Sequence, residues 1–313
     1  MSALRWLMVS VVCTLITLPA KAEINKSEIE ISKIEIVASI KPLALIAAEV
    51  LELVPNANVS VIVGRNASPH QFSLRPSHVQ SLINASAILW LGADFEPYLE
   101  KTLSKIGRSE SAITVNAVSG ILLLEARSVD QKQAAEAHEH HGHHHDHSGT
   151  DDPHLWWSSS NALLIAQALA EHLKKQFPDN WEQIDKGLHN LERRLVSFKS
   201  KVKEIPGKSK ASFVIYHDSL SYLEHELGLA SQRRVAVSPE AKPSVRDLLS
   251  LKMMIVRGKV NCIVVEPNAS QKFIQKVNPD NQARVVMIDP LGWDAKGYSD
   301  FWQRGVNALL DCK

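Results

Sequence analysis

Short apolar runs alternate with longer amphipathic stretches along most of the chain beyond residue 33. Short apolar runs are typical of buried strands, and apolar residues spaced three or four apart are typical of helices with one buried face. The runs predict strands at 34–40, 59–63, 87–91, 112–115, 212–216, 234–237, 262–265 and 284–288. The amphipathic stretches predict helices at 42–53, from 76, at 95–106, 161–177, 219–227, 243–256, from 270 and at 298–310. Strands that alternate with helices predict an α/β fold with parallel sheets.

The longest periodic stretch covers residues 178–204. Its apolar positions follow the helical spacing: Trp181, Ile184, Leu188, Leu191, Leu195, Phe198 and Val202. A helix of about 27 residues would be roughly 40 Å long. We therefore predict a rigid helix at 178–205 that links an N-terminal lobe (23–177) to a C-terminal lobe (206–313). The alternative is a long helix packed on one domain.

The two halves of the chain resemble each other weakly. Ser68-Pro69-His70 and then Pro76-Ser77 in the first half correspond to Ser238-Pro239-Glu240 and then Pro243-Ser244 in the second. Each pair is followed by a predicted strand, a turn and a further helix. This pattern favours two equivalent βα lobes that face one cleft.

Length and charge are consistent with two lobes and exclude one class of partner. The 313 residues, 45% of them hydrophobic, suit two domains of about 110–150 residues. Lys and Arg (35) balance Asp and Glu (34), for a formal net charge of +1. Nucleic-acid binding needs a surplus of cations, so it is not expected here.

The N-terminus has the pattern of a signal peptide. Arg5 precedes an apolar run at 7–18, which is too short to span a bilayer, and an A-x-A cleavage site follows at 20–22. We expect cleavage after Ala22 and a periplasmic mature protein. Cys13 would leave with residues 1–22, so Cys262 and Cys312 predict a disulfide in an oxidising compartment. The alternative is a buried thiol at Cys262 and an exposed one at Cys312.

Half of the 14 histidines crowd into one short tract. They are His138, His140, His141, His143, His144, His145 and His147. The tract has no apolar residues for a core, so we expect a mobile insertion at about 119–150. Imidazoles bind Zn²⁺, Cu²⁺ and Ni²⁺, and ordering such a segment costs entropy, so its metal sites should be weak. The alternative is a solvated loop with incidental metal affinity.

Three other histidines lie at the ends of predicted elements. His70 follows a strand and precedes a helix, His154 precedes a helix, and His217 ends a strand. In open α/β sheets, ligands bind at the carboxyl ends of the strands. A Zn²⁺ ion held by all three imidazoles would bridge the two lobes. Each histidine taken singly also has a structural interpretation.

Four motifs stand out in the chain: residues 68–77, Asp152-Pro153-His154-Leu155-Trp156, Tyr216-His217-Asp218 and Asp289-Pro290-Leu291-Gly292. On these motifs the chain resembles the ABC-transporter solute-binding proteins for zinc and manganese, most closely the ZnuA-type zinc members. The resemblance covers essentially the whole mature chain. The His-rich tract and the cysteine pair also belong to the zinc-type pattern.

The resemblance implies two βα lobes joined by one long helix, with the metal in the cleft between them. His70, His154 and His217 match the three metal-binding histidine positions. Manganese-type members usually have a carboxylate at the position of His217, so three imidazoles favour Zn²⁺. Some zinc members have a Glu at the position of Pro69. Asp289 matches the carboxylate that other members use as fourth ligand; water or a histidine of the tract is the alternative.

The expected function is that of the high-affinity, periplasmic, zinc-binding component of an ABC-type importer. It would act as a monomer and deliver Zn²⁺ to a membrane permease. The alternatives are a protein for manganese or another divalent metal, a periplasmic zinc buffer, and a metal-dependent adhesin. A zinc hydrolase also uses three histidines and a water, but no general base of the H-E-x-x-H kind lies near these histidines. Asp152 and Asp218, each beside a candidate ligand, could accept a ring N–H or have a structural role.

Overall fold

Two parallel sheets with the same strand order organise the protein. The computed structural model describes residues 33–65, 67–70, 72–127, 151–203, 212–236, 241–267 and 269–312. The first sheet has the order β2-β1-β3-β4 and the second the order β6-β5-β7-β8. The strands are β1 (Ile34–Ala38), β2 (Ala57–Val61), β3 (Ala87–Trp90), β4 (Ala112–Thr114), β5 (Phe213–His217), β6 (Arg233–Ala236), β7 (Cys262–Val265) and β8 (Arg284–Met287). The predictions of an α/β fold and of parallel sheets are confirmed. Below, "N lobe" means residues 33–176 and "C lobe" residues 212–312.

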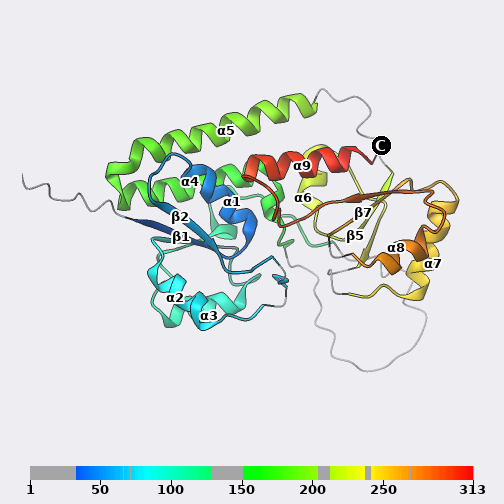
Figure 1. The fold of residues 1–313 in the computed structure, drawn as a ribbon, viewed down its shortest axis with the longest axis horizontal. Helices are drawn as coiled ribbons and strands as arrows, with labels where there is room; N and C mark the ends of the chain where they lie inside the picture. The colour runs from blue at the N-terminus through cyan, green and yellow to red at the C-terminus, as the bar shows by residue number, and fades with distance from the viewer. Residues whose placement is uncertain are drawn as a thin grey trace, which may run out of the picture. The chain divides into compact units, whose positions relative to one another are not determined.

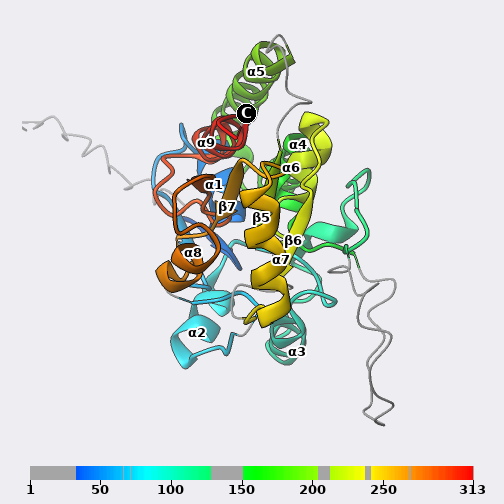
Figure 2. The same ribbon diagram turned by 90° about the vertical axis from the view of Figure 1, so that its right-hand side faces the viewer.

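Helices cover both faces of each sheet. They are α1 (Lys41–Val50), α2 (Pro76–Asn84), α3 (Pro97–Lys105), α4 (Ser159–Gln176), α5 (Trp181–Lys203), α6 (Ser221–Leu227), α7 (Val245–Val256), α8 (Gln271–Val277) and α9 (Tyr298–Leu310). Proline stands in the first turn of α1, α2 and α3, where its missing N–H costs no hydrogen bond. In both Figure 1 and Figure 2, α5 lies on one side of the molecule and α2, α3, α7 and α8 lie on the other.

The side chains of each strand alternate between two cores. In β1, Ile36 and Ala38 enter a large cluster with α1, α4, α5, α6 and α9, whereas Val37 packs with α2 and α3. In β5, Ile215 enters the same large cluster and Val214 enters a third one with α7 and α8. This period of two follows from the pleat of a strand. The large cluster therefore continues from one sheet to the other.

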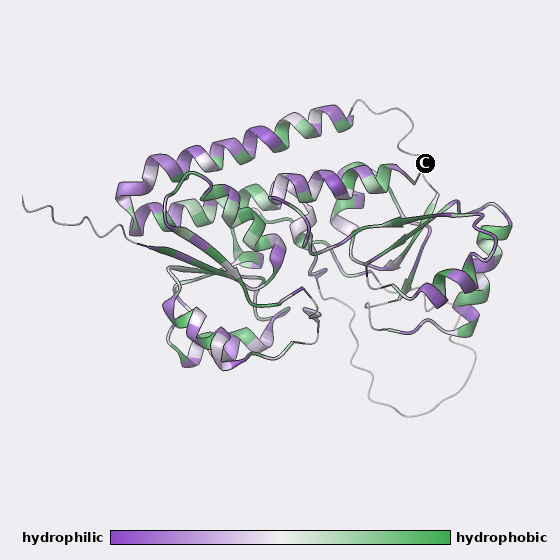
Figure 3. Ribbon diagram, viewed as in Figure 1, coloured by the Kyte–Doolittle hydropathy of each residue, from purple (hydrophilic) through white to green (hydrophobic). Residues whose placement is uncertain are grey.

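The long helix starts later than its sequence pattern predicts. Pro178–Asn180 form a 3₁₀ turn, and α5 begins at Trp181. Its buried side packs on α1 and α4, while its ring contact with α9 joins Phe198 to Trp302. In Figure 3, α5 is mainly purple and white, as expected for a helix with one solvated side. Thus α5 contacts the N-lobe helices and also α9, which comes from the end of the chain.

One buried carboxylate joins three helices. Glu49 of α1 accepts hydrogen bonds from the backbone N–H and the hydroxyl of Ser299 in α9, both at 2.8 Å. It also pairs with Arg194 of α5 at 3.1 Å. Charged groups are rarely buried without such partners, so these contacts fix how α9 lies against α1 and α5.

The predicted disulfide is confirmed. Cys262 at the start of β7 is bonded to Cys312 after α9, and both side chains are buried. The bond holds the end of the chain against the second sheet. Among the described residues, no helix is both long and apolar enough to cross a membrane.

Loss of the disulfide should destabilise the protein substantially. The bond closes a loop of 50 residues. In the chain-entropy model, a loop of this length stabilises by about 4 kcal/mol, because it restricts the unfolded chain. We expect the Cys262→Ala/Cys312→Ala variant to unfold at clearly lower urea concentration than the oxidised protein. An unchanged midpoint would contradict the prediction, and reduction of the unmodified protein provides the matched control.

Candidate metal centre

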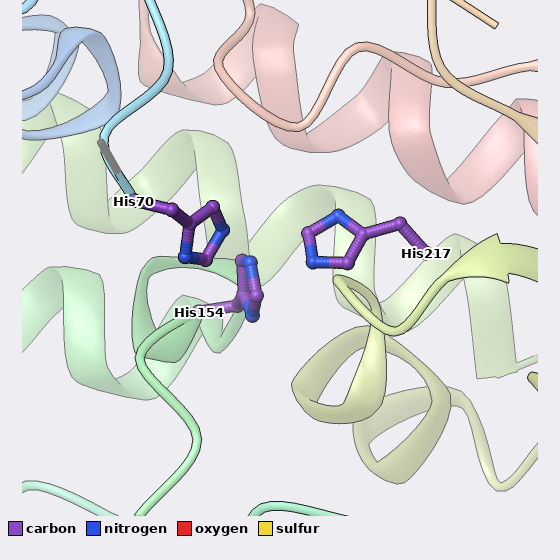
Figure 4. A group of neighbouring side chains, drawn as sticks. All are labelled: His70, His154 and His217. Atoms are coloured by element: carbon purple, nitrogen blue, oxygen red, sulfur yellow. The ribbon is translucent and has the colours of Figure 1, made fainter. Parts of the chain in front are cut away.

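Three imidazole rings converge in one place. The ligand atoms of His70, His154 and His217 all lie within 4.8 Å of one another. Their ring centroids are 5.8 Å (His70–His154), 5.3 Å (His70–His217) and 5.1 Å (His154–His217) apart. Figure 4 shows the rings pointing toward one another from three separate segments. The sequence predicted that these histidines come together, and the geometry agrees.

Each histidine stands at the end of an element. His217 is the last residue of β5, His154 directly precedes a 3₁₀ turn (Leu155–Trp157), and His70 lies in the loop between β2 and α2. His154 and His217 are buried, while His70 is exposed. Two imidazoles are thus embedded in the fold, and the third is presented by a surface loop.

The cluster is slightly wider than a zinc site. Tetrahedral Zn–N bonds of about 2.0–2.1 Å place the nitrogens about 3.4 Å apart. The present atoms, within 4.8 Å, would have to approach by roughly 1.4 Å at most. A movement of this size is within reach of side-chain rotations.

Asp152 orients His154. One carboxylate oxygen accepts hydrogen bonds from the backbone N–H of His154 at 2.8 Å and from its Nδ1 at 2.7 Å. A carboxylate has no proton to give, so Nδ1 carries the hydrogen and Nε2 keeps its lone pair for a metal. The other carboxylate oxygen accepts from the Ser221 hydroxyl of α6. Asp152 therefore fixes both the tautomer and the direction of the ring.

The electrostatics of this pair oppose the effect of burial. Burial by itself would lower the pKa of His154, and it would raise that of Asp152. The attraction and hydrogen bond between the two groups outweigh burial. The pKa of His154 is therefore raised, and the pKa of Asp152 is lowered.

Glu266 orients the ring of His217 as Asp152 orients that of His154, and no sequence motif identified it. Its carboxylate lies 2.7 Å from Nδ1 of His217 and accepts a hydrogen bond from the Ser219 hydroxyl at 3.1 Å. Glu266 directly follows β7, which is the neighbour of β5 in the sheet. A carboxylate at the carboxyl end of the adjacent strand was the signal that could have identified it.

Asp218, the other carboxylate considered from sequence, has different partners. It pairs with Arg127 through a two-point ion pair and lies 3.7 Å from Arg234. Arg127 also pairs with the buried carboxylate of Glu224 at 2.5 Å. Asp218 thus holds Arg127 to the C lobe, while His217 pairs with Glu266.

Asp289 lines the same cavity as the histidines but is not a member of their cluster. The cavity measures about 670 Å³ and reaches from the three histidines to Asp289 and Trp293. The carboxylate of Asp289 accepts hydrogen bonds from the backbone N–H groups of Leu291 and Trp293, at 2.9 and 2.8 Å. Among the described residues, the cluster has no fourth His, Cys, Asp or Glu.

The tract from His138 to His147 lies outside the described residues.

Trp156 and Trp157 pack in the core beside the centre: Trp157 stacks on Phe301 at 4.2 Å, and Trp156 donates to the carbonyl of Pro290 at 2.8 Å. These contacts fix the 3₁₀ turn that follows His154.

Comparison with known proteins agrees with this architecture. The family model for ZnuA, zinc-uptake complex component A, periplasmic, matches residues 36–312. A high-affinity zinc uptake system protein ZnuA from Yersinia pestis is 27% identical over 309 residues, covering 94% of this chain and 95% of that protein. The counterpart from Haemophilus influenzae is 26% identical, covering 89% and 92%.

Solved structures share the fold with different metals. A crystal structure of ZnuA has a TM-score of 0.68 at 23% identity, covering 90% of this chain and 99% of that one. The Zn(II)-bound ZnuA-like domain of AdcA from Streptococcus pneumoniae has a TM-score of 0.69 at 21% identity, with the same coverage. FpvC from Pseudomonas aeruginosa in complex with Mn²⁺ also has a TM-score of 0.69, at 14% identity and covering 90% and 98%. These likenesses establish the fold and leave the choice of metal to the ligand set.

The match to the family model extends over nearly all of the described residues, and it includes the three segments that present the histidine cluster. The chain therefore belongs to the ZnuA family of periplasmic zinc-uptake components.

Proposed function

We propose that His70, His154 and His217 are the protein's Zn²⁺ ligands, with which this zinc-uptake component captures the ion before delivery to the membrane permease of an ABC-type importer. The observation that carries the proposal is the convergence of the three imidazoles, two of them oriented by carboxylates. Family membership makes the chain a binding component of a transport system and not the zinc hydrolase considered as an alternative.

The charges around the cluster suit a divalent cation. Neutral imidazoles leave both charges of Zn²⁺ uncompensated, and Asp152 and Glu266 supply two negative charges one hydrogen bond away. These two carboxylates offset the two positive charges of the ion. Three nitrogen ligands also favour Zn²⁺ over Mn²⁺, which prefers oxygen ligands.

For the fourth position, we propose Asp289. It faces the same cavity as the histidines, and a carboxylate oxygen that accepts one hydrogen bond keeps further lone pairs for a metal. A water molecule is the competing occupant, since the cavity is large enough to hold solvent.

For localisation, we propose export with cleavage after Ala22, as the N-terminal pattern indicates. The periplasmic description of the family and the buried Cys262–Cys312 disulfide support an oxidising compartment. Residues 1–22 lie outside the described residues. We also propose that the protein works as a monomer, with α5 as the link between the two lobes.

Substitution of one histidine should abolish tight zinc binding. We expect His217→Ala to lower the affinity by about 100-fold or more, beyond the 10–100-fold typical of losing an orienting partner. Asp289→Asn should weaken binding less, because three ligands remain. Calorimetric titration with ZnCl₂ measures both. Tight binding by His217→Ala would refute the ligand assignment, and unchanged binding by Asp289→Asn would leave the fourth position to water.

Deletion of residues 138–147 should remove weak zinc binding and spare the tight site. The reason is that the three proposed ligands all lie outside the tract. The same titration, carried to excess Zn²⁺, counts the sites. If the tight site disappeared with the tract, the tract would have to supply a primary ligand.

Removal of the orienting carboxylate should weaken zinc binding without abolishing it. Glu266→Ala leaves Nδ1 of His217 without its acceptor, so the ring loses its fixed direction. We expect a loss of about 10–100-fold in zinc affinity. Glu266→Gln keeps an acceptor oxygen and should recover part of the loss. Equal affinities for the Ala variant and the unmodified protein would show that Glu266 does not position His217.

Zinc affinity should fall as the pH falls. Protons compete with Zn²⁺ for Nε2 of His154, and because the pKa of this group is raised, competition begins above its ordinary value of about 6.5. We expect tight binding to be lost below about pH 6. Asp152→Asn removes the charge that raises the pKa, so its affinity should be lower at neutral pH but less dependent on pH.

Titrations from neutral to acid pH test this expectation. Tight binding that persists at about pH 4.5 would contradict it. In the metal-free protein, this pair affects folding stability in the opposite direction: its contribution to the free energy of unfolding is larger at low pH. The Asp152–His154 attraction stabilises the fold fully below the unfolded pKa of about 6.5, and the contribution is lost as the pH rises through the raised pKa.

A further inference from the structure

An apolar stripe lies exposed on α7, and none of its residues lines the cavity of the metal centre. The stripe consists of Val245, Leu249, Met253 and Val256, whose exposed fractions are 73, 60, 46 and 52%. Their spacing of four, four and three residues places them on one face of the helix, over a length of about 16 Å. Exposed apolar residues are common singly, but a contiguous row marks an interaction surface.

The stripe is not needed for the fold. The opposite face of α7 already packs against the second sheet through Leu251 and Ile255, which are buried. The equivalent helix of the N lobe, α2, also leads from the second to the third strand of its sheet. Its exposed side is mainly polar: Ser77, Gln80, Ser81 and Asn84, with Ile83 as its large apolar residue. The same architecture thus forms without a stripe.

Positive charge borders the stripe. Arg246 and Arg257 are exposed beside it, and Lys252 is partly buried on its other side. The single carboxylate of α7, Asp247, pairs with Arg233 at 2.5 Å. The adjacent helix α8 adds exposed Lys272 and Lys276 and has no acidic residue. A partner complementary to this surface would be apolar along its middle and acidic at its border.

We propose that the α7 stripe docks the protein onto the membrane permease that accepts the zinc, at an apolar surface bordered by carboxylates. The inference rests on the proposed function, which requires such a contact. In Figures 1 and 2, α7 lies on the side away from α5, as do α2, α3 and α8. If the protein docks through α7, the long helix α5 lies on the side away from the permease.

The composition of the stripe favours a protein partner over the lipid surface. Helices that lie in a membrane interface characteristically insert Trp, Phe and Leu, and Trp and Tyr are enriched at that depth, whereas the stripe has no aromatic residue. The stripe is formed by valine, leucine and methionine only. Methionine and arginine are among the residues enriched at protein–protein interfaces.

Binding of the zinc-loaded protein to membranes tests the proposal. Three probes are needed: inner-membrane vesicles from the source bacterium, vesicles from a strain that lacks the zinc permease, and liposomes of the extracted lipids. We expect binding to the first and at least about tenfold weaker binding to the others. Leu249→Glu/Met253→Glu should lose binding to the first by a similar factor, whereas Val196→Glu, at an equally exposed apolar site on α5, should not.

A second pair of variants tests the charged border. Lys252→Glu/Arg257→Glu should weaken vesicle binding and reduce its dependence on salt, while Lys201→Glu/Lys203→Glu on α5 should change neither. Equal binding to all three probes would overturn the proposal in favour of a lipid surface, and unaffected binding by the α7 variants would also overturn it.

Zinc calorimetry on the same variants separates the two proposals. The α7 variants should bind Zn²⁺ like the unmodified protein, because the stripe is not part of the metal centre. If the unmodified protein failed to bind Zn²⁺ tightly, the proposed function would fail. If it bound Zn²⁺ and the α7 variants docked normally, only the docking surface would be wrong.

Discussion

The hydrogen bonds of Asp152 are the constraint on which the metal centre and the lobe contact both depend. Its side chain fixes the ring of His154, and its second oxygen accepts from Ser221 of α6. Its backbone carbonyl accepts from Tyr222, and its N–H donates to Leu124. A single buried residue thus orients a proposed ligand and joins the segment before α4 to the C lobe. A change at Asp152 would disturb both at once.

The carboxylate–imidazole pairs also influence how the proposed site binds protons and metal ions. A buried imidazole that has lost its acceptor could rotate, take the other tautomer, or pair with water. Asp152 and Glu266 exclude these states before a metal arrives, so less order has to be created on binding. The exposed His70 adds the third proposed ligand from a loop, so an ion would meet two fixed imidazoles and one that is accessible.

Much of the metal centre could be predicted from the sequence, because the motifs and strand patterns that place the histidines are local. The strand pattern placed His217 at the end of β5, and the motif around His154 placed it before a helical turn. Glu266 was missed because its contact with His217 spans 49 residues and depends on β7 lying beside β5. Arg127 was missed for the same reason, since its partner Asp218 is 91 residues away. The family resemblance alone suggested Asp289, whose carboxylate also closes a turn at Leu291 and Trp293.

The apolar cluster that runs from one sheet to the other limits how the lobes can move. A wide hinge opening would separate α1 and α5 from α9, and it would break the contacts of Glu49 with Ser299 and of Phe198 with Trp302. Packed interiors resist such separation, whereas small sliding motions and loop movements leave them intact. Exchange of an ion at the proposed centre would then depend on the loop between β2 and α2, which carries His70, and the two lobes would serve as a nearly rigid frame.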